Sequence, residues 1–505
     1  MTARHILSVT LLSFFLFHGV VVAGDRPNVL FIVVDDLNDW VSPLGGHPQA
    51  KTPNFDRLAA RGVTFTSAHC QAPMCNPSRT SFMTGLRPST TGVYALDPWF
   101  RTSEPLKNLV TLPQHFEQNG YVTMATGKLH HDPFPPKDQR EDGVEFSHWG
   151  YAGNHGPYPK KKNVETESKH PMLNWGVFAG GDEDMQDYKV ASWAIDQLKN
   201  PPADKPFFLG VGFRRPHVPC LAPQKWFDLY PDDDTLVMPP IKRNDLDDVP
   251  KSAAYLHWKI PEPRLKWLEA HKEWRHLVRS YLACISFMDA QLGRVLDALD
   301  ASGRADNTII VLFSDHGWHL GEKGMTGKLS LWERSTRVPL IIAGPGIAKS
   351  AKCTRTVELL DLYPTLSELA GLPARSGLEG HSIVPQLKDP TAPREFPAIT
   401  TQDLNNTAVR TEQWRYIRYY DGGEELYDEQ ADPNEWTNLA GDPKYAQTKQ
   451  DLAKWLPTVN KPGIPGSLTR FFEVRPDGTM YWEGKPIDEK RANEPATKTT
   501  PEASP

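Results

Sequence analysis

Residues that could carry out chemistry gather first in the run Cys75–Arg79, Cys-Asn-Pro-Ser-Arg. Pro77 can open a helix, because the first helical position needs no N–H donor. Cys75 would then lie just before a helix N-terminus, which favours negative charge, and Arg79 adds a positive charge one turn later. This environment predicts a lowered pKa for the Cys75 thiol. The ordinary alternative is a buried or disulfide-bonded cysteine.

Other reactive side chains directly follow apolar runs of the sequence. Residues 28–34, 121–126, 205–213 and 307–313 are such runs, and each indicates a strand. The carboxyl ends of parallel strands meet at one edge of a sheet, where open α/β sheets place their ligands. The polar residues that follow these runs are Asp35, Asp36, Lys128, His130, His131, His217, Asp315 and His316, with Lys328 close behind.

The adjacent carboxylates Asp35 and Asp36 suggest a site for a hard cation. Their position at a strand end, with no lysine nearby in the sequence, argues against the alternative of a solvated turn. For the lysine and two histidines that follow the second run, a surface cluster is equally consistent with the sequence. Two prolines flank the segment around His217 and would hold its ring in place, although a packed loop histidine is the alternative.

Length and composition limit the kinds of protein that this chain can be. Its 505 residues allow one large α/β domain and a smaller one. The net charge is −6 and the sequence pI is about 6.3, so a nucleic-acid partner is not expected. Two irregular stretches, about 132–185 and 231–263, look like functional insertions. The longest predicted helix, 274–299, carries one apolar stripe that belongs to the core.

The two ends of the chain differ in composition from the rest. Residues 1–23 have the outline of a secretory signal peptide, with a short membrane anchor as the alternative. We therefore expect a secreted or periplasmic protein that does not stay in the membrane. Residues 24–393 would form the main domain. Short alternating runs predict a C-terminal subdomain over 394–484 on antiparallel strands, and 485–505 should be disordered.

Four cysteines remain besides Cys75, and they permit three disulfide pairings or none. They are Cys70, Cys220, Cys284 and Cys353. An exported protein of this size does not need disulfides, so free buried thiols fit the sequence equally well.

Several motifs together resemble the type I sulfatases, in which the motif cysteine is oxidised to formylglycine. Within this family the chain is most similar to the iduronate-2-sulfatase group, and the resemblance covers most of the chain. It implies an α/β fold with a large, mixed, mostly parallel sheet flanked by helices, and a smaller C-terminal α+β subdomain on an antiparallel sheet. The motifs are Val33–Leu37, Cys75–Arg79, Gly127-Lys128 with His131, Pro216–Pro219, Ser314–Trp318 and Leu426–Asp428.

The resemblance also implies a role for each site residue. One Ca²⁺ would be held beside the modified Cys75, although an imidazole is a less usual calcium ligand. Its ligands would be Asp35, Asp36, Asp315 and His316.

The remaining implied roles concern the reaction. Hydrated formylglycine would attack sulfur with one hydroxyl and release sulfate through the other. Arg79 would hold this diol in position, and two lysines, Lys128 and Lys328, would bind sulfate oxygens. His217 would protonate the leaving alcohol and His131 would remove the second diol proton, with His130 as the other choice because the motif spacing fits both.

The expected function is a secreted sulfatase that removes sulfate from carbohydrates, with exo action on uronic acid 2-sulfate as the nearest analogy. Its partners would be a sulfated carbohydrate and a formylglycine-generating or anaerobic sulfatase-maturing enzyme. A phosphoester or phosphonate hydrolase on the same scaffold is the second hypothesis. If Cys75 stays unmodified, the pocket could only bind a sulfated glycan, which is the third.

Overall fold

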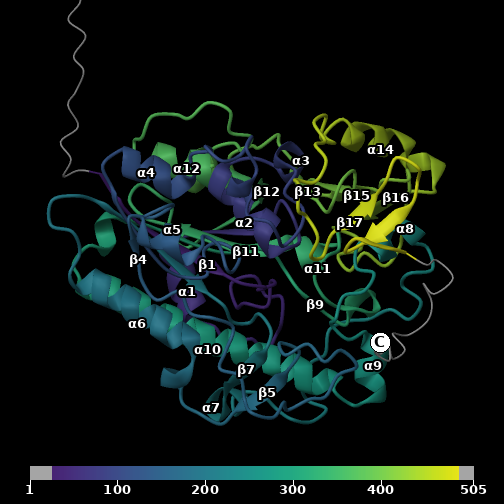
Figure 1. Ribbon diagram of the computed structural model, residues 1–505, viewed down its shortest axis with the longest axis horizontal. Helices are drawn as coiled ribbons and strands as arrows, with labels where there is room; N and C mark the ends of the chain where they lie inside the picture. Colours follow the sequence, from purple (N-terminus) through teal and green to yellow (C-terminus); the bar gives the residue numbers. More distant parts are fainter. Residues whose placement is uncertain (1–25, 488–505) are drawn as a thin grey trace, which may run out of the picture.

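The computed structural model describes residues 26–487 (Figure 1). The predicted signal peptide and most of the predicted disordered tail lie outside this range. The first residues of that tail differ from the prediction, because β19 (Lys485–Pro486) pairs with β18 (Met480–Trp482). Among the described residues, no helix combines the length and apolarity that a membrane span requires.

One eight-stranded sheet forms the centre of the molecule, in the order β12-β2-β11-β8-β1-β6-β3-β4. All neighbouring pairs are parallel except those of β11, which runs antiparallel to both β2 and β8. The sheet is therefore mixed and mostly parallel, as expected. Its strands are β1 (Asn28–Val34), β2 (Gly62–His69), β3 (Val122–Gly127), β4 (His148–Trp149), β6 (Phe207–Phe213), β8 (Thr308–Ser314), β11 (Arg337–Ala343) and β12 (Ala351–Glu358).

Each face of this sheet has its own apolar core, because successive side chains of a strand point to opposite faces. In β1, Ile32 and its alternate neighbours pack into one core together with α6 (Gln186–Lys199) and α10 (Trp274–Ala301). Phe31 and its alternate neighbours pack into the other, with α2 (Cys75–Thr84), α4 (Leu112–Gln118) and α12 (Leu362–Leu369). Figure 1 shows these two helix groups on opposite sides of the sheet.

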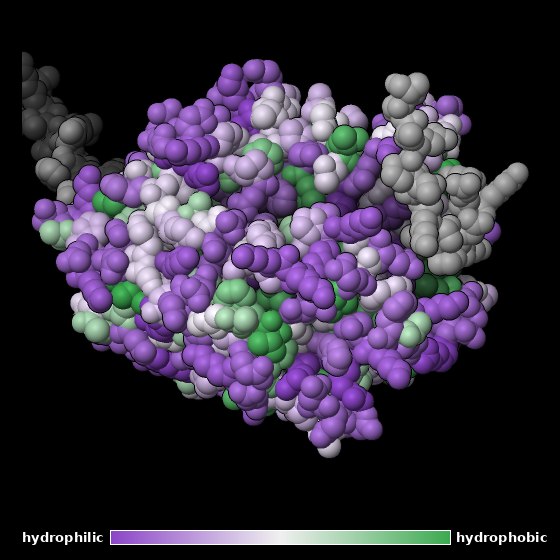
Figure 2. Space-filling model, turned by 60° about the horizontal axis from the view of Figure 1, so that its bottom comes forward, coloured by the Kyte–Doolittle hydropathy of each residue, from purple (hydrophilic) through white to green (hydrophobic). Residues whose placement is uncertain are grey.

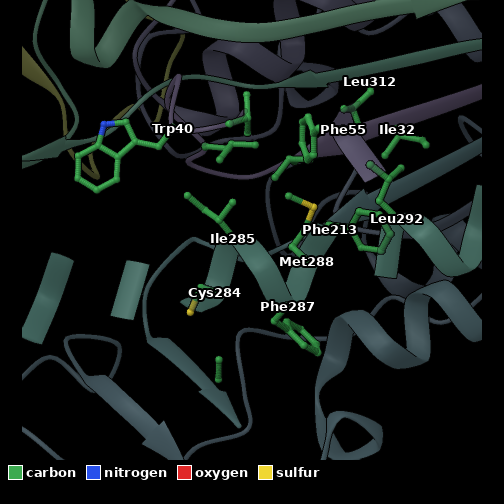
Figure 3. Close-up of a cluster of buried hydrophobic side chains, with 14 of the residues drawn as sticks. Ile32, Trp40, Phe55, Phe213, Cys284, Ile285, Phe287, Met288, Leu292 and Leu312 are labelled. Atoms are coloured by element: carbon green, nitrogen blue, oxygen red, sulfur yellow. The ribbon is translucent and has the colours of Figure 1, made fainter. Parts of the chain in front are cut away.

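The long helix α10 covers most of the first face. Figure 3 shows Ile285, Met288 and Leu292 of this helix close to Ile32 and Leu312 of the sheet. All of these side chains are essentially excluded from solvent. The predicted apolar stripe is therefore confirmed as core, and the helix extends two residues beyond its predicted end.

The C-terminal part carries an antiparallel sheet in the order β13-β14-β15-β16 and lies at one end of the large sheet (Figure 1). Its strands are β13 (Ala398–Thr401), β14 (Thr407–Arg410), β15 (Trp414–Arg418) and β16 (Glu424–Asp428), and a three-stranded sheet adds β17 (Phe472–Val474) to β18 and β19. The predicted antiparallel C-terminal sheet is confirmed, although β13 was not among the predicted strands.

Shorter elements connect these layers. They are α1 (Pro53–Ala59), α3 (Pro88–Thr91), α5 (Lys137–Glu141), β5 (Trp175–Phe178), β7 (Cys220–Pro223), α7 (Gln224–Phe227), α8 (Lys251–Tyr255), α9 (Leu265–Ala270), β9 (His319–Leu320), β10 (Thr326–Gly327), α11 (Glu333–Thr336), α13 (Val384–Lys388) and α14 (Ala446–Ala453). All five cysteines are buried and free, so the free-thiol alternative holds. On the face shown in Figure 2, hydrophobic residues are scattered among hydrophilic ones.

Candidate active site

The cysteine motif occupies the N-terminus of α2. The helix begins at Cys75 itself, with Met74 as its N-cap residue in an extended conformation, so the cysteine is not outside the helix as predicted. Pro77 is the third helical residue, where the missing N–H still has no intrahelical partner to lose. Gly85 ends the helix in a left-handed conformation with φ of 73°. The helix therefore presents Cys75 at its amino end.

The predicted meeting of strand ends is confirmed at one edge of the large sheet. Strands β1, β3, β6 and β8 are mutually parallel and deliver their carboxyl ends to this edge. Because β11 is antiparallel to both β8 and β2, strand β2 runs in the same direction as β1 and delivers the Cys75 segment to the same edge. The backbone N–H of Asp35 donates to Phe213 and that of Asp315 donates to Val34, which continues the ladder into the site.

Four polar side chains surround the sulfur of Cys75, which is 1% exposed. The Sγ atom lies 3.0 Å from Lys328 Nζ and 3.6 Å from Lys128 Nζ. His316 Nε2 is 3.3 Å away and Asp35 Oδ1 is 3.6 Å away. Burial alone would raise the pKa of the thiol, but the two ammonium groups lower it below its usual value. The predicted direction is correct, and the main cause is the lysines from distant segments.

Arg79 bridges the two carboxylates Asp35 and Asp315 of the site. Its guanidinium donates to Asp315 Oδ2 at 2.9 Å and to Asp35 Oδ1 at 3.1 Å. It also donates to the backbone carbonyls of Lys128 and Leu129. Arg79 thus fixes the two carboxylates and the end of β3 relative to α2, and its side chain is fully buried.

The carboxylates Asp35 and Asp36 are each paired with a lysine. Lys128 Nζ contacts Asp35, and Lys328 Nζ lies 2.6 Å from Asp36 Oδ1. The absence of a lysine partner, inferred from sequence neighbours, was therefore wrong, because both lysines arrive from separate strand ends. Against the effect of burial, Lys128 holds the pKa of Asp35 well below its usual range. Burial raises the pKa of Asp36 to about 8, with Asp35 adding to the effect.

The acidic residues fit a divalent cation. Ligand atoms of Asp35, Cys75, Asp315 and His316 lie within 4.8 Å of one another, and Asp36 shares a second such group. Asp36 Oδ2 is buried without a hydrogen-bond partner, which leaves it free to bind an ion. His316 Nδ1 lies 3.1 Å from the Gly317 carbonyl, which can only accept a hydrogen bond, so the lone pair of the neutral ring is on Nε2 and faces the carboxylates.

The predicted histidines differ in what they face. His217 Nδ1 donates to the Val218 carbonyl at 2.6 Å, so its Nε2 points toward Asp36 Oδ2, 3.7 Å away. Burial lowers the pKa of His131 to about 3, and the positive charges of Lys128 and Lys328 act in the same direction. His130 packs instead against Trp99 and Glu145.

One histidine of the site, His155, gave no sequence signal. It lies in the irregular stretch 132–185, and its ring centroid is 4.7 Å from that of His217. Its Nε2 atom is buried without a hydrogen-bond partner. Arg215 donates to the backbone carbonyls of His155 and Gly156 and so holds this loop against the site. A lone histidine before a Gly-Pro pair has no pattern that sequence reasoning could have used.

Comparison with known proteins agrees with this geometry. The family model described as Sulfatase matches residues 27–372. A second model, described as N-sulphoglucosamine sulphohydrolase, C-terminal, matches residues 321–461. Together they span the large sheet, the site and the antiparallel C-terminal sheet.

The relatives that cover most of the chain include two named sulfatases. A protein named Sulfatase from Formosa agariphila is 44% identical over 86% of this chain and 87% of its own length. Iduronate 2-sulfatase from Mus musculus is 33% identical over 70% of each chain.

Solved structures of both sulfatases and phosphonate hydrolases share the fold. A 2-O GAG sulfatase is 26% identical with a TM-score of 0.67, and the match covers 85% of this chain and 91% of that one. A phosphonate monoester hydrolase from Agrobacterium radiobacter has a TM-score of 0.70 at 23% identity and covers 92% and 100%. At that identity the second likeness shows the fold alone.

Proposed function

Because the chain belongs to the sulfatase family and is a sulfuric ester hydrolase, we propose that it removes sulfate from carbohydrates through a formylglycine made from Cys75. The observation that carries this proposal is the position of Cys75 Sγ, between two lysine ammonium groups and a cluster of buried carboxylates. A uronic acid 2-sulfate is the nearest analogy for the substrate, by likeness to the mouse iduronate 2-sulfatase.

The aldehyde at position 75 would supply, once hydrated, a hydroxyl nucleophile for sulfur. Deprotonation of the second hydroxyl would re-form the aldehyde and expel the sulfate bound to the first oxygen. The ammonium groups of Lys128 and Lys328 both contact this position and would bind the sulfate oxygens as point charges. Arg79 would act through the carboxylates that it holds. It is therefore a positioning residue in this proposal.

A bound Ca²⁺ would polarise a sulfate oxygen and neutralise the carboxylates around it. Asp35, Asp36, Asp315 and His316 are the residues that would hold it. Removal of the ion with a chelator should abolish sulfate release and lower the melting temperature, because like charges would be left unscreened. Recovery with Ca²⁺ but not with Mg²⁺ would support the choice of metal.

Two histidines would move protons in this scheme. His217 Nε2 points into the site and would carry the proton for the leaving alcohol. Burial keeps the pKa of His217 well below its usual value, and the negative charge of a bound sulfate ester acts in the opposite direction. His131 would remove the proton that releases sulfate, because the charges of both site lysines act on its ring, while His130 would have a packing role.

Two measurements test the proposal. Mass spectrometry of the intact peptide that contains residue 75 reports whether the thiol has become an aldehyde. Protein with a verified aldehyde is then offered a panel of sulfated mono- and oligosaccharides together with an aryl sulfate and an aryl phosphate. Release of sulfate is expected, and a faster reaction with the aryl phosphate would contradict the proposal.

The setting of the protein is also part of the proposal. We propose export by the segment 1–23 and maturation of Cys75 by a formylglycine-generating or anaerobic sulfatase-maturing enzyme. Expression with and without such an enzyme, followed by N-terminal sequencing of the mature protein, tests both points.

A further inference from the structure

A glutamate from the irregular stretch 231–263, Glu262, packs next to the Lys328 segment. The Glu262 side chain lies over Gly327, the residue before Lys328, so closely that a Cβ on Gly327 would be 3.2 Å from its Cγ. Thr326 Oγ1 donates to the Pro263 carbonyl at 2.7 Å and fixes this approach. Burial alone would raise the pKa of Glu262, but Arg470 and, more weakly, Lys328 lower it.

An arginine from the C-terminal part meets this glutamate. Both terminal nitrogens of Arg470 donate to the Glu262 carboxylate, at 3.0 and 3.1 Å. The Glu262 side chain is 5% exposed and that of Arg470 is 17% exposed. A guanidinium has five N–H donors, and these two bonds leave three, for which the residues in 26–487 provide no acceptor. Arg470 is thus held in a fixed orientation with donors to spare, beside the site and open to solvent.

The third contributor is the irregular stretch 132–185. The positive charge of Arg470 acts on His170, and Lys162 Nζ donates to the His170 carbonyl at 2.6 Å. Residues 158–170 contain four lysines against two glutamates, in a chain whose net charge is −6. Arg470 and Lys162 therefore bring two positive charges here, of which Glu262 balances one, while Lys328 is already paired with Asp36.

We infer that Arg470, oriented by Glu262 and flanked by Lys162, anchors a second anion-binding subsite next to the position of the scissile sulfate. This inference rests on the proposed function. The subsite would take a carboxylate or a second sulfate carried by the same substrate, because an arginine fork binds both groups through paired N–H donors. The substrate class is then a sulfated sugar that carries a further anionic group.

The test is the double substitution Arg470→Gln/Glu262→Gln, which removes both charges together and leaves no buried charge unpaired. Four substrates are compared: a uronate 2-sulfate disaccharide, its methyl ester, a disulfated disaccharide without a uronate, and an aryl sulfate. In the double variant, KM for substrates with a second anion should rise about 10-fold or more over the parent value, with kcat nearly unchanged. KM for the methyl ester and the aryl sulfate, which lack a second anion, should stay close to the parent value. Whether the uronate or the disulfated sugar shows the rise identifies the group that binds.

A matched control is the double substitution Arg243→Gln/Glu269→Gln. In the parent, the terminal nitrogens of Arg243 lie 3.0 and 2.7 Å from the Glu269 carboxylate oxygens on the surface. The control should change KM for none of the four substrates. If KM changes by the same factor for all four substrates in the Arg470/Glu262 variant, the ion pair only holds the C-terminal part against the main domain. The inference is then wrong. Arg470→Lys, which keeps the charge but not the fork, serves if the double variant does not fold, and a partial rise in KM is then expected.

The outcome of this test can be separated from that of the proposed function. If the mature protein releases no sulfate from any substrate, the proposed function fails. The subsite is then measured by calorimetric titration of the same disaccharides into Cys75→Ala with the native and the doubly substituted pair. Weaker binding of the anionic disaccharides, but not of the methyl ester, supports the subsite, and equal binding overturns it.

Discussion

Two of the buried ionic clusters among residues 26–487 differ in how completely protein atoms satisfy them. The candidate-site cluster comprises Asp35, Asp36, Lys128, Asp315, His316 and Lys328 around Cys75. The C-terminal cluster comprises Glu333, Arg410, Arg415, Glu429 and Glu435. In the second, Arg415 Nε lies 3.0 Å from Glu429 and 2.7 Å from Glu435, while its terminal nitrogens contact Glu333 and the Leu331 carbonyl.

Within the described chain, Asp36 Oδ2 of the first cluster is buried without a hydrogen-bond partner, and so are His131 Nδ1 and His155 Nε2 beside it. In the second cluster only Glu435 Oε1 lacks such a partner, and Arg415 Nε lies 2.7 Å from it. Buried charge occurs in both places, so burial alone does not distinguish a site from a structural network. We take unsatisfied donors and acceptors that converge on one point as the sign of a ligand, because such groups are costly to leave unpaired.

The largest expected effect separates the clusters by activity. Cys75→Ala should reduce kcat for sulfate release by at least about 10⁴-fold, because the nucleophile is lost. Its melting temperature should stay within a few degrees of the parent, since the change removes one small side chain. Sulfate release and thermal unfolding measure the two properties. A variant that is inactive only because it is unfolded would contradict the assignment.

The C-terminal cluster should respond in the opposite way. Arg415→Met leaves buried carboxylates without their cation and should lower the free energy of unfolding by about 3–5 kcal/mol. Activity per folded molecule should persist. Urea unfolding measures the first and active-site titration the second. Arg418→Met, at the exposed end of the same strand β15, is the control and should change stability little.

Two neighbouring histidines sharpen the comparison within a single loop. The charges of both site lysines act on His131, which we propose as the proton acceptor. His131→Ala should therefore reduce kcat about 100-fold. His130→Ala should change kcat only a few fold, because the ring packs against Trp99 and Glu145. Steady-state kinetics of both variants decide, and a larger loss for His130→Ala would reverse the choice between them.

The smallest effect is a pH dependence of stability. Burial and the like charge of Glu429 outweigh Arg415 and raise the pKa of Glu435 to about 8. The folded state therefore binds this proton more tightly than the unfolded state, and the stability that it contributes is lost as pH rises from about 5 to 8. Relative to Glu435→Gln, the native chain should lose on the order of 1 kcal/mol over this range. Urea unfolding at pH 5.5 and 8.5 measures the difference, and parallel curves would contradict the shift.

The sequence predicted the strands that carry the site because their cores are continuous apolar runs. It did not predict β12, in which Lys352 and Thr354 alternate with buried residues at the edge of the sheet. Nor could periodicity give the direction of β11. Because β11 runs antiparallel, the carboxyl end of β2 lies at the same sheet edge as the candidate site. The direction of β11 depends on pairing between segments about 270 residues apart.

The candidate site was predictable wherever a reactive residue directly follows a strand. Asp35, Lys128 and Asp315 belong to this class, His217 follows four residues after β6, and the structure brings all four together. Partners that converge from different segments were not predictable, and both lysine–carboxylate pairs are examples. His155 comes from an irregular loop whose position depends on Arg215, so no local pattern could announce it.

The depth of Cys75 restricts when another protein can reach it. The residue is 1% exposed, Ser78 Oγ in its helix donates to the Asp315 carbonyl at 2.6 Å, and Lys328 Nζ lies against its sulfur. Those contacts come from segments made about 240 residues later. The proposed oxidation of this thiol by another enzyme would therefore have to take place on the nascent or still extended polypeptide. The interval between synthesis of residue 75 and docking of residues 308–343 would then set the time for maturation, so slower folding should raise the converted fraction.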